Sequence, residues 1–270
     1  MARKQILKAT KKLNRENYYS NEMDWRYMSA TYFKKFLECE ASAMNELNNP
    51  VEDKSDSLVQ GNYLHTYFES KEAHEQFINE YHDQLYTNKG EKYAVTKKTD
   101  RMIEALDTDD FFHYVYQGER EVILDGKLYG YPWKARIDCL NVKRGYFVDL
   151  KTTRELHKSY GYLPEEHRYK RFTDEYNYAL QMGVYKKLLQ QKYRKPFKAF
   201  IIAVDKQAIP DKTAIEMPFE LMMEQLKVIE DNIDRVADVM RGDIEPTRCE
   251  RCDYCRLTKQ MTGFIDPRDL

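Results

Sequence analysis

The sequence predicts an α/β fold, in which a mixed central sheet is flanked by helices. Two observations carry this prediction. The composition, with 42% hydrophobic and 33% charged residues, supports a folded core beneath a well-solvated surface. The order of the patterns is helices, a β-rich block, a helix, one apolar strand and a last helix, which favours a sheet with a helix crossing over it.

Helical patterns fill the chain before residue 119. Residues 1–27 are polar and predict a loosely ordered arm, which leaves residues 28–270 as a single domain. Ser29 is a suitable N-cap for the first helix. The helices are expected at these approximate ranges: 30–47, 57–85 and, as one or two short pieces, 98–116.

The β-rich block contains three runs of β-forming residues: 119–125, 127–140 and 145–153. The turn-like segments DGK and NVKRG separate them, so we expect a three-stranded antiparallel meander. A polar loop follows. The elements after the meander are a loop over about 154–172, a helix over 173–192, a strand over 198–206, an edge strand over 213–218, and a helix over 218–241 that ends at Gly242.

The bulk charge does not indicate a nucleic-acid-binding protein. The net charge is −1, so a DNA-binding surface has to be a local basic face balanced by acidic residues elsewhere. No run approaches the roughly 18 to 20 apolar residues that cross a bilayer. The N-terminus is basic, but no apolar segment follows it, so it does not look like a secretory signal. We therefore expect a cytoplasmic protein without a membrane span.

Two carboxylates and a lysine stand out at the ends of the second and third runs. Asp149 and Lys151 are two residues apart on a strand, so their side chains point to the same face. Carboxylates hold the divalent cation that phosphodiester hydrolysis needs, and a lysine beside them can orient or help deprotonate water. The side chain of Asp138 can lie close to Asp149 and Lys151 only if the hairpin between these two strands bends or its turn is long. On its own, D-x-K also fits a structural ion pair.

Further motifs surround this set in a fixed order. They are Gly61-x-x-x-His65, an acid near 121, Arg136-x-Asp138, Asp149-Leu150-Lys151 and Gln181-x-x-x-Tyr185. This order resembles the RecE- and RecB-like branch of the PD-(D/E)XK nucleases, over roughly residues 28–256. It is also similar to the lambda-type exonucleases and the CRISPR-associated iron–sulfur exonucleases, and most of all to phage and prophage RecE-like proteins. The resemblance implies a restriction-endonuclease-like core.

The resemblance also implies roles for these residues, with Mg²⁺ or Mn²⁺ as the metal. The implied metal ligands are His65, Asp138, Asp149 and the backbone carbonyl of Leu150. Lys151 matches the catalytic lysine, and Gln181 and Tyr185 match the motif that supports the lysine and contacts the DNA backbone. Glu121 is the upstream acid, with Glu119 as its competitor. Ordinary helix packing remains the alternative for the histidine, the glutamine and the tyrosine.

Three of the five cysteines crowd into seven residues: Cys249, Cys252 and Cys255. Three thiolates at this spacing can bind one metal centre but need a fourth ligand, for which Cys39 is the candidate. Resembling nucleases hold a [4Fe–4S] cluster in this way, which joins the two ends of the chain. A bound zinc ion and a site without metal are the alternatives, because the spacing between Cys252 and Cys255 is shorter than in those nucleases. Cys139 is expected to be a buried apolar residue.

Basic residues after the catalytic strand predict a loop that contacts DNA phosphates, or else a merely solvated loop: Arg154, Lys158, Lys170 and Arg171. The leading hypothesis is a metal-dependent exonuclease acting at linear duplex or single-stranded DNA ends, beside a single-strand annealing protein in phage recombination. An end trimmer of the CRISPR-associated type, or an endonuclease, is the alternative. A non-catalytic DNA-binding or scaffold protein and a zinc-stapled interaction module belong to other classes. Cleavage polarity and homo-oligomer formation stay open.

Overall fold

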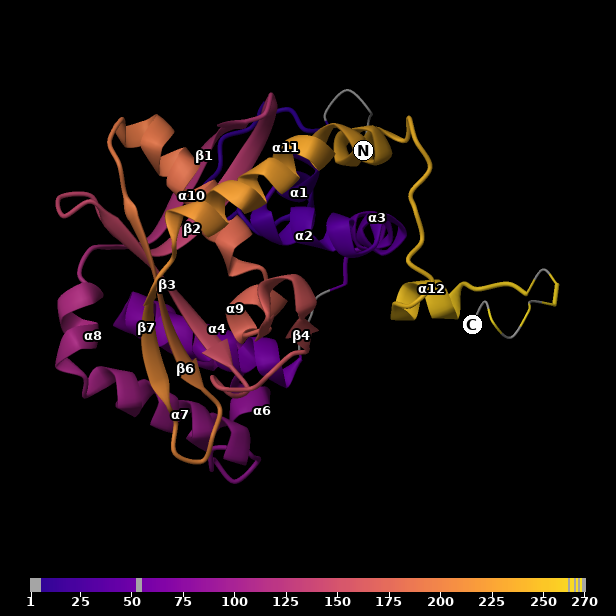
Figure 1. Ribbon diagram of the computed structural model, residues 1–270. Coiled ribbons are helices and arrows are strands. Elements are labelled where there is room, and N and C mark those ends of the chain that lie inside the picture. The colour runs from indigo at the N-terminus through magenta and orange to yellow at the C-terminus, as the bar shows by residue number, and fades with distance from the viewer. Residues whose placement is uncertain (1–5, 52–54, 262, 265, 267, 269–270) are drawn as a thin grey trace.

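The computed structural model describes residues 6–51, 55–261, 263–264, 266 and 268 (Figure 1). A central five-stranded sheet has the strand order β1-β2-β3-β6-β7. Its strands are β1 Glu119–Leu128, β2 Tyr131–Asn141, β3 Tyr146–Thr153, β6 Lys198–Asp205 and β7 Lys212–Glu216. The first three form the expected antiparallel meander, β6 joins β3 in parallel, and β7 pairs with β6 in antiparallel orientation. The expectation of a mixed sheet is confirmed.

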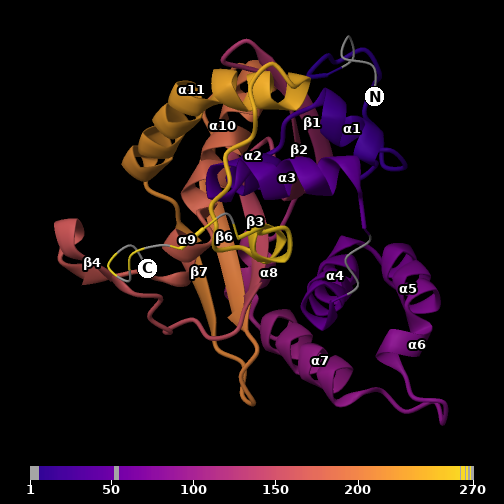
Figure 2. The ribbon, with the colours of Figure 1, turned by 90° about the vertical axis from the view of Figure 1, so that its right-hand side faces the viewer.

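Helices cover both faces of this sheet, because strand side chains alternate between two apolar layers. On one face, Phe147 and Ile201 pack with α2 (Ala30–Glu38), with α11 (Phe219–Arg241) and with α10 (Tyr178–Tyr193), the helix that crosses over from β3 to β6. On the other face, Val148 and Ile202 pack against a layer of helices that includes α4 (Asp56–Glu69) and α7 (Ala94–Asp107) (Figure 2). The active-site strand β3 therefore lies between two helical layers.

The long helices expected near the N-terminus are divided in the structure. The first is interrupted at Cys39, whose backbone is extended at φ −165° and ψ 106°, so that it ends α2 (Ala30–Glu38) and precedes α3 (Glu40–Asn48). The second is interrupted at Ser70, whose hydroxyl accepts a hydrogen bond from the amide of Ala73 and starts a new helix. The other helices of this part are α4 Asp56–Glu69, α5 Lys71–Glu80, α6 His82–Leu85, α7 Ala94–Asp107 and α8 Asp110–Val115.

The first turn of the meander lies later than the DGK segment indicated. Strand β1 continues through Gly126, and the hairpin turns at Tyr129 and Gly130, which both have positive φ angles, as a type I′ turn requires. A Cβ atom at Gly126 would lie 2.6 Å from the side chain of Gln191 and 2.8 Å from that of Leu188. This glycine therefore marks the close approach of α10 to the sheet, and it does not mark a turn.

The segment before residue 28, expected as a loosely ordered arm, packs on the domain where the structure describes it. Residues 21–26 form α1 (Asn21–Arg26), and Leu7, Met23 and Trp25 are buried. Lys134 of β2 is 2% exposed, and its ammonium group contacts Asp24 at 2.7 Å and the carbonyl of Tyr18 at 2.5 Å. Residues 6–27 are thus fixed to the sheet by apolar burial and one buried ion pair. Residues 1–5 lie outside the described residues.

The chain after the meander follows the expected order. The polar loop contains a small hairpin of β4 (Tyr162–Leu163) and β5 (Arg168–Tyr169), separated by η2 (Pro164–Glu166) and followed by the short helix α9 (Phe172–Glu175). Helix α11 ends at Gly242, which has the left-handed φ of 72° expected at that position. The tail then reaches α12 (Asp253–Leu257) beside α3. None of the described helices is long and apolar enough to cross a membrane.

Candidate active site

Three acids lie side by side on neighbouring strands. Arg120 pairs with Cys139 and Val122 with Ile137, so Glu121 of β1 lies opposite Asp138 of β2. Cys139 also pairs with Val148, which places Asp149 of β3 on the other side of Asp138. Hairpin pairing therefore brings the two aspartates together, contrary to the expectation from sequence. The reason is that β2 continues past Asp138 to Asn141, so the two acids are equally far from the turn.

His65 of α4 completes a group of metal-binding atoms. Its Nδ1 lies 3.5 Å from Oδ2 of Asp138. One ligand atom each from His65, Glu121 and Asp138 lies within 4.8 Å of the others. The amide of Leu150 donates a hydrogen bond of 2.6 Å to the same carboxylate of Asp138, which fixes its orientation. Among the described residues outside the cysteine cluster, this is the group of histidine and acids that could hold an ion.

Asp149 lies next to this group, in contact with the lysine and with α10. Its Oδ2 is 2.5 Å from the ammonium of Lys151, and its Oδ1 accepts a hydrogen bond of 3.0 Å from Gln181. The same amide nitrogen of Gln181 donates to the hydroxyl of Tyr185 at 2.9 Å. Asp149 is 1% exposed, so its negative charge depends on these partners. The structure thus brings together all the residues expected from the D-x-K and Q-x-x-x-Y motifs.

The electrostatics of the site favour binding of a cation. Burial and the nearby Asp138 raise the pKa of Glu121 to about 7, although Arg136 opposes this shift. Burial also raises the pKa of Asp149 despite the contact with Lys151. The pKa of Asp138 is lowered, because the charge and hydrogen bond of His65, together with Lys151 and the amide of Leu150, outweigh the effect of burial. Three buried carboxylates in one place repel each other, and a divalent cation with oxygen ligands relieves that repulsion. The donor set fits such an ion.

Glu121, and not Glu119, is the acid that the structure brings to this group. Glu121 is 7% exposed, whereas Glu119 is exposed at the beginning of β1. Glu121 also has a φ angle of 53°, which is rare for a residue with a side chain and is found at functional sites. This distortion lies within a strand whose register is otherwise regular, and no sequence pattern indicated it.

Two further cations lie at the site. Arg136, which the R-x-D pattern included, forms an ion pair with Glu121 through Nε and lies 3.4 Å from Glu69. Lys34 of α2 had no signal in the sequence. Its ammonium group donates to the carbonyl of Tyr176, and burial together with the charge of Lys151 lowers its pKa to about 8.

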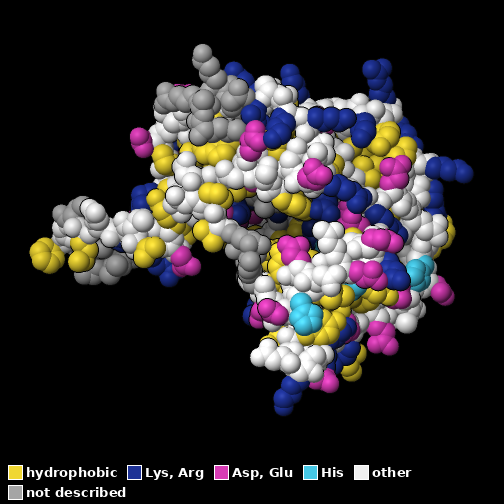
Figure 3. Space-filling view, turned by 180° about the vertical axis from the view of Figure 1, so that it is seen from behind, with side chains coloured by type: hydrophobic (Ala, Val, Ile, Leu, Met, Phe, Trp, Pro, Cys, Tyr) yellow, Lys and Arg dark blue, Asp and Glu magenta, His cyan; other side chains and the backbone are white. Residues whose placement is uncertain are grey.

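Viewed from behind, the surface is hollowed near its centre, with Lys and Arg side chains beside the hollow (Figure 3).

The basic residues expected to bind phosphate lie on the loop after β3. Arg154 directly follows β3, and its carbonyl accepts a hydrogen bond of 3.1 Å from the side chain of Gln207. The others make contacts within the loop. Lys158 lies over the ring of Tyr160 at 5.1 Å, the backbone of Lys170 bonds to that of Gly161, and Arg171 reaches the carbonyl of His157 at 3.5 Å.

The four cysteines form a second cluster. The sulfur of Cys39 lies 3.6 Å from that of Cys255, which is 4.0 Å from that of Cys249, and Cys252 belongs to the same group within 4.8 Å. Two backbone amides lower the pKa of Cys249 to about 6, which favours the thiolate that binds metal. The helix break at Cys39 places its sulfur here. Cys139 is fully buried in the apolar layer with α4, away from this cluster.

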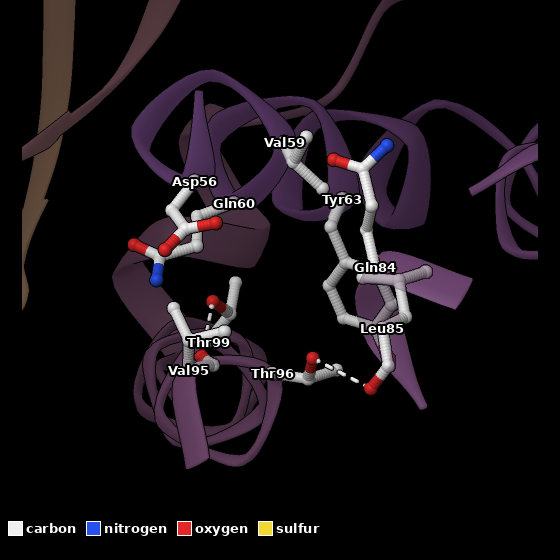
Figure 4. A pocket seen from close by; sticks show the side chains of 9 residues that line it. All are labelled: Asp56, Val59, Gln60, Tyr63, Gln84, Leu85, Val95, Thr96 and Thr99. Atoms are coloured by element: carbon white, nitrogen blue, oxygen red, sulfur yellow. Dashed lines mark hydrogen bonds between the residues drawn. The ribbon is translucent and has the colours of Figure 1, made fainter. Parts of the chain in front are cut away.

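A small pocket on α4 lies away from the acids (Figure 4). Thr96 and Thr99 border it, with their hydroxyls bonded to the backbone carbonyls of Leu85 and Val95. Its volume of about 10 Å³ is near the minimum for one water molecule. It is too small for a nucleotide, so the group of acids remains the candidate active site.

Fold and site together define the class. A mixed sheet whose adjacent strands carry paired aspartates, with a lysine two residues after the second, is the core of the PD-(D/E)XK nucleases. The chain belongs to one family of that class, described as a PDDEXK-like domain of unknown function (DUF3799), whose model matches residues 29–258. The expected relationship to the PD-(D/E)XK nucleases of the RecE-like branch is confirmed.

One solved structure is similar to nearly the whole chain. It comes from Eubacterium rectale and is provisionally named an exonuclease; the two chains share 31% sequence identity with a TM-score of 0.87, over 96% of this chain and 98% of the other. A second structure, of SSO0001, has 17% identity and a TM-score of 0.31 over 83% of this chain and 91% of its own, a similarity too low to support an argument. None of the curated proteins matches this chain.

Proposed function

We propose that this protein is a divalent-metal-dependent DNA exonuclease that hydrolyses phosphodiester bonds at DNA ends. The observation that carries the proposal is the row of Glu121, Asp138 and Asp149 across three strands, with Lys151 in contact with the last of them. Oxygen ligands of this kind suit Mg²⁺ or Mn²⁺. The name of the Eubacterium rectale protein supports the same type of reaction.

Each side chain has a role in this proposal. His65, Glu121 and Asp138 hold the cation, and Asp149 with the carbonyl of Leu150 contributes further oxygens. When bound, the cation activates water and neutralises charge on the phosphate. Asp149 orients Lys151 through their direct contact, while Gln181 fixes the other oxygen of that carboxylate. Tyr185 in turn fixes Gln181.

Lys151 acts as a cation in this site. Although burial opposes the charge, the contact with Asp149 raises the pKa of the ammonium, so it stays protonated at neutral pH. In this protonated form it orients water and stabilises charge on the phosphate. Of the two roles expected from sequence, orientation and deprotonation, the electrostatics favour the first.

Replacing this lysine tests its role. We expect Lys151→Ala to lower the single-turnover cleavage rate by about 10²- to 10³-fold, as for the loss of one preorganised donor to developing charge. DNA affinity in Ca²⁺, measured by fluorescence anisotropy, is expected to change little. Lys198→Ala is the matched control, because Lys198 also pairs with a carboxylate, at 3.0 Å, but lies at the exposed beginning of β6. A wild-type cleavage rate in the Lys151 variant would contradict the role.

The form of the substrate tests whether the enzyme needs an end. With Mg²⁺ or Mn²⁺, we expect digestion of linear duplex or single-stranded DNA, while covalently closed circles of the same sequence remain intact. A gel assay that follows both forms in one tube provides the comparison. Rapid nicking of the closed circle would instead support the endonuclease alternative, and cleavage of neither form would favour a non-catalytic DNA-binding protein.

The biological setting is part of the proposal. The RecE-like relationship supports resection of DNA ends beside a single-strand annealing protein during phage recombination, in the bacterial cytoplasm. End trimming of the CRISPR-associated type would use the same site. Phosphate contacts from the loop after β3 and from Lys34 would hold the DNA backbone in either case. Assembly into a homo-oligomer is compatible with this function.

The cysteine cluster is proposed as a structural metal centre. A tetrahedral zinc ion with Zn–S bonds of about 2.3 Å holds its sulfurs roughly 3.8 Å apart. The sulfur separations of 3.6 Å and 4.0 Å agree with this spacing. In a [4Fe–4S] cluster each thiolate binds a different iron atom, which holds the sulfurs farther apart. The geometry thus supports a single ion over the iron–sulfur cluster that the resemblance implied.

A further inference from the structure

A short segment before the matched family region reaches the active site. The family model begins at residue 29, whereas residues 14–20 lie before it. Asn14 and Asn17 exchange two hydrogen bonds of 2.9 Å between side chain and backbone. Tyr18 is 7% exposed, and its carbonyl accepts from the buried Lys134; Ser20 caps α1. The intervening residue, Tyr19, is therefore held in place on both sides along the chain.

The side chain of Tyr19 itself is open to solvent. It is 71% exposed, and its ring meets that of Tyr18 edge-on at 4.9 Å. The guanidinium of Arg136 lies 5.2 Å from the ring centre of Tyr19. The same guanidinium forms the ion pair with Glu121, one of the proposed metal ligands. Only one side chain thus separates an exposed, fixed aromatic ring from the metal site.

An exposed cation belongs to the same segment. Arg15 is 67% exposed at its side chain and lies 3.1 Å from Glu69, the last residue of α4. Arg136 approaches the same carboxylate at 3.4 Å. Two arginines therefore share Glu69, one of them fixed toward the metal site and the other facing solvent. A ring and a cation in this arrangement match what single-stranded DNA offers, namely a base face and a phosphate.

We propose that Tyr19 is a stacking platform for a base at the end of the DNA strand that is cleaved, with Arg15 as the contact for an adjacent phosphate. The inference rests on the proposed nuclease function and specifies how a strand end is presented to it. Every base has a flat face, so stacking on Tyr19 secures the end regardless of its sequence. The segment before the family region thereby contributes to the substrate site.

Fluorescence of a modified base tests this contact. Short single-stranded oligonucleotides with 2-aminopurine at either end are titrated with protein in Ca²⁺. We expect the wild-type protein to quench the fluorescence at one end only, because stacking quenches this base. Tyr19→Ala is expected to remove the quenching and to weaken binding by roughly 5- to 150-fold, the range measured for one base stacked on an aromatic residue. Tyr19→Phe keeps the ring and should behave like the wild type.

Tyr114→Ala is the matched control. Tyr114 is 57% exposed and also stacks on an arginine, Arg144, at 4.2 Å, but it lies on α8. The Tyr114→Ala variant is expected to leave the DNA affinity and the quenching of 2-aminopurine unchanged. If Tyr19→Ala binds and quenches like the wild type while the wild type degrades DNA, the stacking platform is refuted and the nuclease proposal stands. A wild-type protein that neither binds nor degrades DNA overturns both.

Discussion

Asp138→Ala is expected to abolish DNA cleavage while leaving the fold in place. Asp138 lies between the other two acids and within 4.8 Å of the ligand atoms of His65 and Glu121, so its loss removes the central ligand of the metal. A bound metal supplies several kcal/mol of transition-state stabilisation, which corresponds to a rate loss of at least about 10³-fold. Stability without metal should fall only modestly, because the loss of the hydrogen bond from the amide of Leu150 is partly offset by the removal of one of three repelling carboxylates.

Two measurements check this expectation. Cleavage of linear DNA gives the rate, and calorimetric titration with Mn²⁺ reports the metal affinity, which should fall together with the rate. Asp138→Asn keeps the size of the side chain and separates loss of charge from loss of packing. Glu119→Ala serves as the control, because this acid is exposed at the beginning of β1. Near wild-type cleavage by Asp138→Ala would mean that the active site lies elsewhere.

Asp149→Ala should lose activity to a similar extent but also lose stability. Its removal leaves the partly buried ammonium of Lys151 without its partner at 2.5 Å. Breaking one side of a buried ion pair costs about 3 to 5 kcal/mol. A lower melting temperature for this variant than for Asp138→Ala would follow from that difference.

Cys39→Ser is expected to release the metal of the cysteine cluster and loosen both ends of the chain together. Cys39 and Cys255 are separated by 216 positions in sequence, yet their sulfurs lie 3.6 Å apart. Closing so long a loop lowers the conformational entropy of the unfolded chain, which the chain-entropy model for covalent cross-links converts into a stabilisation of about 5 kcal/mol. This is the largest stability effect that we expect from a single substitution.

Limited proteolysis and metal analysis check the expected effect of Cys39→Ser. Cleavage should appear in both the region around α3 and the tail after Gly242, and the melting temperature should fall. Cys139→Ser is the control, because that cysteine lies in the apolar layer and contacts no cluster sulfur within the described residues. The purified wild-type protein should be colourless, with about one zinc per chain. A brown, iron-containing protein would restore the [4Fe–4S] assignment, and stability unchanged by Cys39→Ser would contradict the proposed metal centre.

The sequence by itself determined the features that depend on local pattern. The runs of β-forming residues and the turn segment NVKRG predicted the meander, and Gly242 marked the end of α11 correctly. The order of motifs that resembles the PD-(D/E)XK nucleases also implied His65, Asp138, Asp149 and Gln181, which the structure brings together. Such features follow from a few neighbouring residues, because side-chain direction and backbone preference act over one or two turns or strands.

Only the tertiary structure decided which side chains meet across the sheet and between layers. The register of β1 on β2 selected Glu121 over Glu119, and the packing of α2 on α10 brought Lys34 near Lys151. The helix break at Cys39 and the packing of residues 6–27 likewise escaped the local pattern. These outcomes depend on burial and charge pairing between segments that are distant in sequence. Propensity and periodicity carry no information about such pairings, since the free energy that fixes them arises only when the layers are packed together.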